Sequence, residues 1–305
     1  VKGQNWGFPT YNWEVMASND YSWWKLRFEQ MSFYFDAFRI DHILGFFRIW
    51  SIPMNQVEGI MGRFVPAIPI TQQEIDKKGI SADMDRYTKP FINESVLFTY
   101  FGYDNDYAKQ HFVTALQEGK YELSQNFQTQ RAVDVYFKTL PNDEWHLKMQ
   151  QGLYNLISNV ILFKGDEPET YHFRFNMEGT LSFQNLDEKS KNALRDLYVN
   201  YFFVRQDKAW EKESLNKLPM LKKSTNMLIC GEDLGLVPNC VPHVLRQLGM
   251  LSLEVQRMPK ASNKTFFHPT DAPYLSVVTP SSHDTSTIRG WWEEDKNKTQ
   301  QFFNH

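Results

Sequence analysis

Three short apolar runs in this sequence each lead into an acidic residue, and this recurrence limits the possible folds more than any other feature. The runs lie in FDAFRIDHIL at 35–44, NMLICGEDLG at 226–235 and YLSVVTPSSHD at 274–284. A fourth apolar run, LSLEVQRM at 251–258, also has the pattern of a strand. After the second run, residues 237–249 form a helical pattern with Pro238 near its start and Gly249 just past its end. Alternating strands and helices favour a parallel sheet with right-handed crossovers.

The strand-end acids favour one fold within the α/β class. In a (β/α)8 barrel of the TIM type, the catalytic groups come from the carboxyl ends of several strands. GxGxxG and GxxxxGK[ST] motifs do not follow these runs, which argues against a dinucleotide-binding or P-loop fold. Only about four barrel strands can be recognised, and the sequence begins without Met and ends in a helical pattern. We therefore expect an incomplete portion of a barrel, which by itself would have little or no activity.

A long segment separates the first two acidic motifs. Asp41 and Glu232 are roughly 190 positions apart, far more than one crossover between parallel strands requires. Within this segment, 188–210 has helical periodicity and 171–186 is typical of a hairpin with Gly179 near its turn. We expect three parts: a barrel segment at 1–64, an inserted, mainly helical subdomain at 65–220, and a second barrel segment at 221–305.

The first part of the chain is rich in aromatic residues. The opening GQNWGFPTYNWEVM predicts an ordered loop, and Trp6 and Tyr11 are candidates to contact a ligand because flat rings stack on the apolar faces of sugars. Packing in the core is the commoner role of an aromatic residue. Residues 18–35 predict a helix, with Ser18 or Asp20 as a possible N-cap.

Composition excludes several classes of function. The 33 basic and 36 acidic residues give a formal charge of -3, which offers no broad basic surface for nucleic acid or an anionic membrane. No run of about 18 apolar residues is present, and the first 20 residues lack the order of a signal peptide. Two cysteines, Cys230 and Cys240, are too few for a disulfide framework. These features predict a cytoplasmic protein with neutral partners.

Each acidic motif has both a catalytic and a structural interpretation. Arg39 and Asp41 are two residues apart and share one strand face, so the guanidinium would keep Asp41 ionised as a nucleophile must be; the same pattern fits a structural ion pair. Glu232 has less cationic surroundings, where a carboxyl group can keep its proton and act as a general acid. Alternatively, Glu232 or Asp233 caps the helix at 237–249, and Asp284 caps the helical pattern that begins in TSTIRGWW.

Two further chemistries are possible but weakly supported. His42 and His283 each lie beside an aspartate, which raises the possibility of a metal site. HExxH, CxxC and EF-hand spacings are all absent from the sequence. Cys230 could be a nucleophile only with a partner histidine that the sequence does not identify.

Taken together, the motifs resemble a known family. FRIDHILGFFRIW, CGEDLGLVPNCV and SSHDTSTIRGWWEED occur in this order and resemble the 4-α-glucanotransferases, the amylomaltase or disproportionating-enzyme family of barrels that act on α-glucans. The opening GQNWGFPTYNW is similar to the Gln-x-Trp-Gly-x-Pro loop of that family. The long interruption resembles the plant-cytosolic type, which carries a large insertion here and usually has N-terminal starch-binding modules. Such modules are possible in the full-length protein, although none is visible in this sequence.

The resemblance implies a retaining transfer reaction on maltose, maltooligosaccharides and α-glucan polymers, with no cofactor and no metal. It implies three catalytic carboxyl groups with separate roles: the nucleophile Asp41, the acid/base Glu232 and the transition-state stabiliser Asp284. It also implies substrate-binding roles for Arg39, His42, His283, Trp6 and Tyr11. An α-glucan hydrolase of the amylase type and a non-catalytic glucan-binding fragment are the alternatives.

Overall fold

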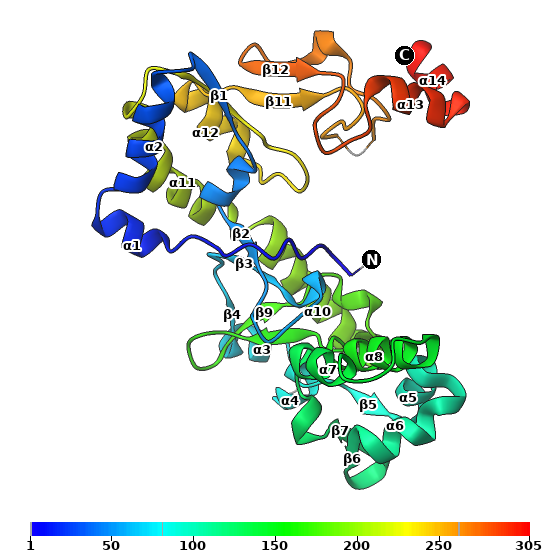
Figure 1. Ribbon diagram of the computed structural model, residues 1–305. Helices are drawn as coiled ribbons and strands as arrows, with labels where there is room; N and C mark the ends of the chain where they lie inside the picture. The colour runs from blue at the N-terminus through cyan, green and yellow to red at the C-terminus, as the bar shows by residue number, and fades with distance from the viewer. Residues whose placement is uncertain (1, 81, 262) are drawn as a thin grey trace. The chain divides into compact units, whose positions relative to one another are not determined.

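The computed structural model describes residues 2–80, 82–261 and 263–305, and shows a mixed α/β chain (Figure 1). Internal contacts divide the chain into two compact units. The first, here called the helical unit, contains residues up to Thr10 and Trp50–Gln206; the second, the parallel-strand unit, contains Tyr11–Ile49 and Asp207–His305. Most of the long segment between the first two acidic motifs therefore belongs to the helical unit. The division expected at residues 64 and 220 stays a prediction.

Four parallel strands form the centre of the parallel-strand unit. They are β1 (Ala37–Ile40), β10 (Leu228–Gly231), β11 (Ser252–Val255) and β12 (Ser276–Thr279). β1 pairs with β10 and β11 pairs with β12, both in parallel, and a parallel bridge between Cys230 and Leu251 connects β10 to β11. The order is thus β1-β10-β11-β12 with all strands in one direction. The four strands expected from the apolar runs are confirmed.

Helices accompany these strands. They are α1 (Trp13–Ser18), α2 (Ser22–Ser32), α11 (Asp207–Lys223), α12 (Cys240–Leu248), α13 (Ile288–Glu294) and α14 (Lys296–Phe303). α12 buries Val241, Val244 and Leu245 on one face. Gly249 ends it with φ of 62°, a left-handed conformation that glycine adopts without strain. The helix expected after Glu232 is confirmed, including its C-terminal glycine.

The helix expected over 18–35 is corrected by the structure. The segment contains the end of α1 and then α2, separated by a turn in which Asp20 and Tyr21 have φ of 57° and 53°. Tyr21 takes the N-cap position and its ring is buried, so neither Ser18 nor Asp20 caps this helix. Trp24 and Phe28 are buried as the periodicity predicts, whereas Phe35 lies beyond the helix and is exposed. Burial of the aromatic ring outweighs the capping preference of the polar residues.

The helical unit combines short helices with antiparallel strands. Its helices are α3 (Gln72–Lys77), α4 (Asp85–Thr88), α5 (Glu94–Phe101), α6 (Asn105–His111), α7 (Gln130–Phe137), α8 (Glu144–Ile157), α9 (Leu181–Gln184) and α10 (Glu188–Phe203). Its antiparallel sheets have the orders β4 (Ile70–Thr71), β9 (Thr170–Phe173), β8 (Leu162–Lys164), and β5 (Ile92–Asn93), β7 (Lys120–Leu123), β6 (Val113–Ala115). β2 (Ile49–Ser51) pairs with β3 (Arg63–Val65).

The core of the helical unit lies where α5 packs against α8. Phe101, Leu97 and Leu153 are fully buried there. A Cβ atom on Gly152 would lie 2.3 Å from the Phe101 ring, so the close approach of these two helices requires glycine. Among the described residues, none of the helices is both long enough and apolar enough to span a bilayer.

The hairpin expected at 171–186 is wrong. β9 pairs with β8, which precedes it in the sequence, and Gly179 ends a 3₁₀ turn that leads into α9. The Thr180 side chain accepts a hydrogen bond from the Phe183 N–H and caps α9. Helix capping at Thr180 therefore replaces the second strand, and the helical pattern at 188–210 forms α10 and the start of α11.

Candidate active site

The parallel strands bring three acidic residues to one edge of the parallel-strand unit. Asp41 directly follows β1, Glu232 directly follows β10, and Asp284 lies in the loop after β12. Because these strands run in the same direction, their carboxyl ends share that edge. The topology thus groups residues that are far apart in the sequence.

A chain of polar contacts connects the first and third of these loops. Arg39 Nη2 donates to Asp41 Oδ1 at 2.8 Å, and Arg39 Nη1 lies 2.9 Å from His283 Nδ1. His283 Nε2 lies 3.2 Å from Asp284 Oδ1. Arginine can only donate, so Nδ1 of His283 is the acceptor where the two side chains form a hydrogen bond. The His283 imidazole therefore joins the guanidinium to the third carboxyl group.

Glu232 is much less exposed to solvent than the two aspartates. It is 9% exposed, whereas the side chains of Asp41 and Asp284 are 74% and 67% exposed. Burial raises the pKa of Glu232, and the negative charge of Asp41 adds to this, while a hydrogen bond from the His42 backbone N–H opposes it. A carboxyl group in this environment holds its proton to higher pH than an ordinary glutamate does.

The backbone fixes the position of Glu232 relative to the loop after β1. The His42 N–H donates to Glu232 Oε2 at 2.6 Å, while the Ile43 N–H donates to the Glu232 carbonyl at 3.0 Å. His42 adopts a left-handed conformation with φ of 44°, which turns the chain after Asp41. Burial, followed by the charge of Arg48, lowers the pKa of the His42 imidazole.

Gly231 makes this arrangement possible. A Cβ atom at this position would lie 2.5 Å from Cδ1 of Ile43, which is fully buried. Any larger residue would push Ile43 away from the end of β10. The hydrogen bond between His42 and Glu232 therefore depends on glycine in the preceding strand.

Asp233 has a structural environment that the sequence did not indicate. It is 1% exposed, accepts a hydrogen bond from the Leu253 N–H at 2.9 Å and pairs with Lys260 Nζ at 2.8 Å. Lys260 also lies 2.7 Å from Oε1 of Glu254, which is buried. Burial raises the pKa of Asp233, although Lys260 opposes this. Asp233 thus ties the end of β10 to β11.

The capping interpretations of the acidic residues are wrong. The N-cap of α12 is Asn239, and the Cys240 N–H donates to Asp207. The N-cap of α13 is Thr287, whose side chain accepts from the Gly290 N–H. These helix starts do not use Glu232, Asp233 or Asp284 as their caps.

The other chemistries find little support. In the part of the chain that the structure describes, no group of three or more His, Cys, Asp or Glu side chains could hold a metal ion. Both cysteines are free. Burial raises the pKa of the Cys230 thiol, and its Sγ lies 3.8 Å from the Ser252 carbonyl oxygen. A partly buried thiol with a raised pKa is a poor nucleophile.

The two aromatic candidates belong to different units. Trp6 is part of the helical unit, is 59% exposed, and its indole N–H donates to Gln4 Oε1 at 3.1 Å. Tyr11 belongs to the parallel-strand unit, where its ring centroid lies 5.2 Å from that of Trp13 and 5.5 Å from that of Trp24. Their contact with substrate stays a prediction.

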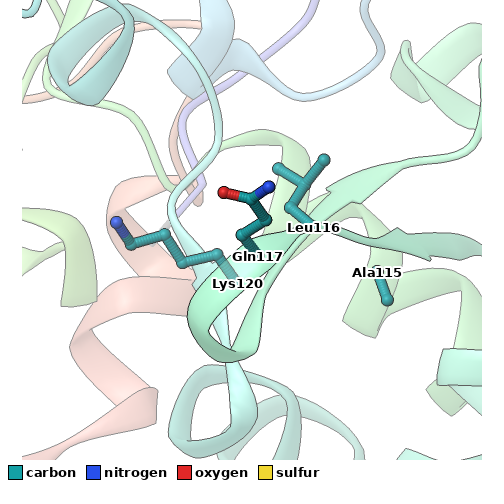
Figure 2. Close-up of a pocket in the computed structure, with 4 residues that line it drawn as sticks. All are labelled: Ala115, Leu116, Gln117 and Lys120. Carbon is teal, nitrogen blue, oxygen red and sulfur yellow. The ribbon is translucent and has the colours of Figure 1, made fainter.

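An open hollow in the helical unit lies at the β6-β7 hairpin. Figure 2 shows its lining residues, Ala115, Leu116, Gln117 and Lys120. These side chains supply one cation and one amide but neither an acid nor a nucleophile.

Comparisons with known proteins agree on one group. A family profile described as 4-alpha-glucanotransferase matches residues 1–305. The 4-alpha-glucanotransferase DPE2 of rice (Oryza sativa subsp. japonica) is 42% identical over 315 residues, which cover 99% of this chain and 32% of the rice protein. A 4-alpha-glucanotransferase of Chlamydia pneumoniae is 41% identical over 68 residues, 22% of this chain and 12% of that protein. The chain thus spans about a third of the rice relative and shares a shorter segment with the bacterial one.

Proposed function

Because the chain belongs to the 4-alpha-glucanotransferase family, glycoside hydrolase family 77, we propose that the intact protein transfers glucosyl or maltooligosaccharyl units between α-1,4-glucans. One observation carries the proposal. An exposed aspartate paired with a guanidinium, Asp41, and a buried glutamate with a raised pKa, Glu232, follow adjacent parallel strands. A retaining glycosyl transfer requires one ionised and one protonated carboxyl group.

In the first step, Asp41 attacks the anomeric carbon of the donor and forms a glycosyl ester. The bond from that carbon to the leaving oxygen breaks, and Glu232 gives its proton to this oxygen. In the second step, Glu232 takes the proton from a hydroxyl group of the acceptor sugar, whose oxygen attacks the anomeric carbon and releases Asp41. Two inversions retain the configuration of the glycosidic bond.

The remaining strand-end residues have supporting roles in this proposal. Arg39 holds Asp41 through its 2.8 Å hydrogen bond and orients its carboxylate toward the sugar. Asp284 and His283 bind hydroxyl groups of the donor sugar, and they do so most strongly in the transition state. His42 presents its ring beside Asp41 as a further hydrogen-bonding group. Transfer rather than hydrolysis requires that the acceptor sugar exclude water from the ester, for which Trp6 and Tyr11 are candidates.

The proposal extends to the fold. Family 77 enzymes have a TIM-barrel fold, and four consecutive parallel strands with acids at their carboxyl ends fit part of a (β/α)8 barrel. The inserted segment at 65–220 supplies a scaffold or shapes the acceptor site, because the three candidate acids all lie outside it. A cytoplasmic location and N-terminal starch-binding modules remain expectations from the sequence.

Product analysis on maltose tests the function. We expect the intact protein to convert maltose into glucose together with maltotriose and longer chains, which chromatography separates. Release of glucose without longer chains would instead favour an α-glucan hydrolase. Binding of maltooligosaccharides without turnover would favour a non-catalytic glucan-binding protein. Asp41→Asn serves as the control for a contaminating activity.

A further inference from the structure

We infer that Arg257 is a positioning residue for the loop at 280–286, which carries His283 and Asp284. The inference rests on the proposed function for its effect on catalysis. Arg257 follows β11 and does not belong to any of the acidic motifs. Its guanidinium, however, makes four hydrogen bonds to residues of this loop.

The hydrogen bonds of Arg257 reach both ends of the loop. At the start, Nε donates to the Pro280 carbonyl oxygen at 3.1 Å. At the other end, Nη2 donates to Thr285 Oγ1 at 3.0 Å and to the Ser286 carbonyl oxygen at 2.6 Å, and Nη1 lies 3.4 Å from Ser286 Oγ. His283 and Asp284 lie between these anchor points. The guanidinium therefore fixes the span of chain that carries both residues.

The position of Arg257 is itself fixed by neighbouring elements. The Gln256 N–H donates to the Thr279 carbonyl oxygen at 2.9 Å, and the Phe267 N–H donates to the Gln256 carbonyl oxygen at 2.9 Å. Arg257 Cζ also lies 5.1 Å from the ring centroid of Trp291 on α13, within the range of a cation–π contact. The guanidinium is thus held between the end of β11 and α13.

The loop needs this anchor because its functional side chains are exposed. His283 and Asp284 are 62% and 67% exposed, so packing does not hold them in place. Hydrogen bonds between Ser282 and Thr285 shape the turn, but they do not connect it to β11. Without Arg257, the 2.9 Å contact between His283 and Arg39 would lose its support. A shift of about 1 Å in a catalytic group can cost on the order of 100-fold in rate.

The geometry also predicts that lysine replaces this residue poorly. A guanidinium presents its donors in a rigid planar fork, whereas lysine has a single ammonium group on a flexible stem. One ammonium group cannot reach Pro280 and Ser286 together in the manner of Nε and Nη2. Arg257→Lys should therefore recover only part of the function that Arg257→Ala loses.

The test compares Arg257→Ala and Arg257→Lys in the intact protein with Arg289→Ala as the control. Arg289 lies near the same loop on α13, its side chain is 90% exposed, and it pairs with Glu293 on its own helix. We expect kcat on maltose to fall by about 10- to 100-fold in Arg257→Ala, less in Arg257→Lys and little in Arg289→Ala. KM should change much less than kcat, because the loop acts mainly in the transition state.

A double-mutant cycle separates positioning from general stability. If Arg257 acts through the loop, Arg257→Ala should lower kcat by less than about 3-fold in an Asp284→Asn background, since the group that it positions is already lost. An equal loss in both backgrounds would overturn the inference. A change in KM alone in Arg257→Ala, with kcat intact, would overturn it as well.

Hydrogen exchange provides a readout that does not depend on activity. Amides at 280–287 should exchange faster in Arg257→Ala and Arg257→Lys than in the unmodified protein and in Arg289→Ala. Unchanged exchange in this segment would contradict the positioning role of Arg257, even if the variants lose activity. If the unmodified protein fails to transfer glucan but the loop loosens in the variants, the proposed function fails while the structural role of Arg257 stands.

Discussion

The backbone N–H of His42 donates a 2.6 Å hydrogen bond to Oε2 of Glu232, which connects the loop after β1 to the residue after β10. A backbone donor places the carboxyl group without bringing a full positive charge to it. Burial can therefore still raise the pKa of Glu232. The same contact leaves the neighbouring Asp41 free to pair with Arg39. Two carboxyl groups on adjacent strands thus acquire different electrostatic environments.

This environment should make Glu232 a cost to stability at neutral pH. The pKa of Glu232 in the folded protein lies above the ordinary glutamate value of 4.5. Its contribution to the free energy of unfolding is therefore favourable below pH 4.5 and is lost as the pH rises through the raised pKa. Glu232→Gln keeps an oxygen for the His42 N–H but cannot ionise. We expect Glu232→Gln to raise Tm at pH 7 relative to the unmodified protein, and the difference to shrink as pH falls toward 4.5. A difference that stayed constant across this range would argue against a raised pKa.

Asp41→Asn should remove transfer while leaving the fold intact. An amide cannot form the glycosyl ester, so the rate on maltose should fall by about three orders of magnitude or more. The lost ion pair with Arg39 is exposed on the Asp41 side, and its removal should change the free energy of unfolding by less than about 1 kcal/mol. Initial rates and urea unfolding measure the two effects. Near-normal turnover in the folded variant would exclude Asp41 as the nucleophile.

Asp284→Asn should affect the transition state more than the bound substrate. The carboxylate strengthens its contacts as positive charge develops on the sugar ring, and an amide cannot follow this change. We expect kcat to fall by about 100-fold or more with a much smaller change in KM. Steady-state kinetics on maltotriose would show the difference. A rise in KM alone would reduce Asp284 to a substrate contact.

Lys260→Met should destabilise the parallel-strand unit. The substitution leaves Asp233, which is 1% exposed, without its cation, and breaking such a buried pair costs about 3 kcal/mol. The charge of Lys260 lowers the pKa of Asp233, and the substitution removes this effect. The loss in free energy of unfolding should therefore be greatest at neutral pH and smaller in acid, where the Asp233 carboxyl group takes up a proton.

Urea unfolding at pH 7 and pH 5 measures this effect. Lys264→Met is the matched control, because the Lys264–Asp271 pair has both side chains about half exposed and, as a surface ion pair, should contribute little to stability. If the free energy of unfolding falls by the same small amount in both variants, the pair of Asp233 and Lys260 adds little to stability.

The sequence predicts the strands and acids well because their signals are local. An apolar run followed directly by Asp41 or Glu232 marks a strand and the point where it ends, and Gly249 marks the end of a helix through its own backbone preference. These features need only a few neighbouring residues. They account for the parallel strands and for most of the candidate site.

Other features depend on contacts between distant residues. Arg257 acts on Ser286, 29 positions away, and Lys260 reaches Asp233, 27 positions away. Neither spacing follows a helix or strand period, so no sequence pattern indicates them. Tyr21 takes a left-handed conformation because its ring is buried against the rest of the unit. The start of α2 is therefore determined by tertiary packing, which outweighs the local capping preference of Ser18 and Asp20.

Trapping of the glycosyl-enzyme intermediate tests the central claim most directly. Glu232→Gln in the intact protein should still react with an α-maltosyl fluoride, because fluoride leaves without a proton, but transfer to an acceptor should stall without a base. Mass spectrometry of proteolytic fragments should then find one maltosyl unit attached at Asp41. A maltosyl unit on a different carboxyl group, or rapid transfer by the variant without any bound intermediate, would contradict the assignment of Asp41 and Glu232.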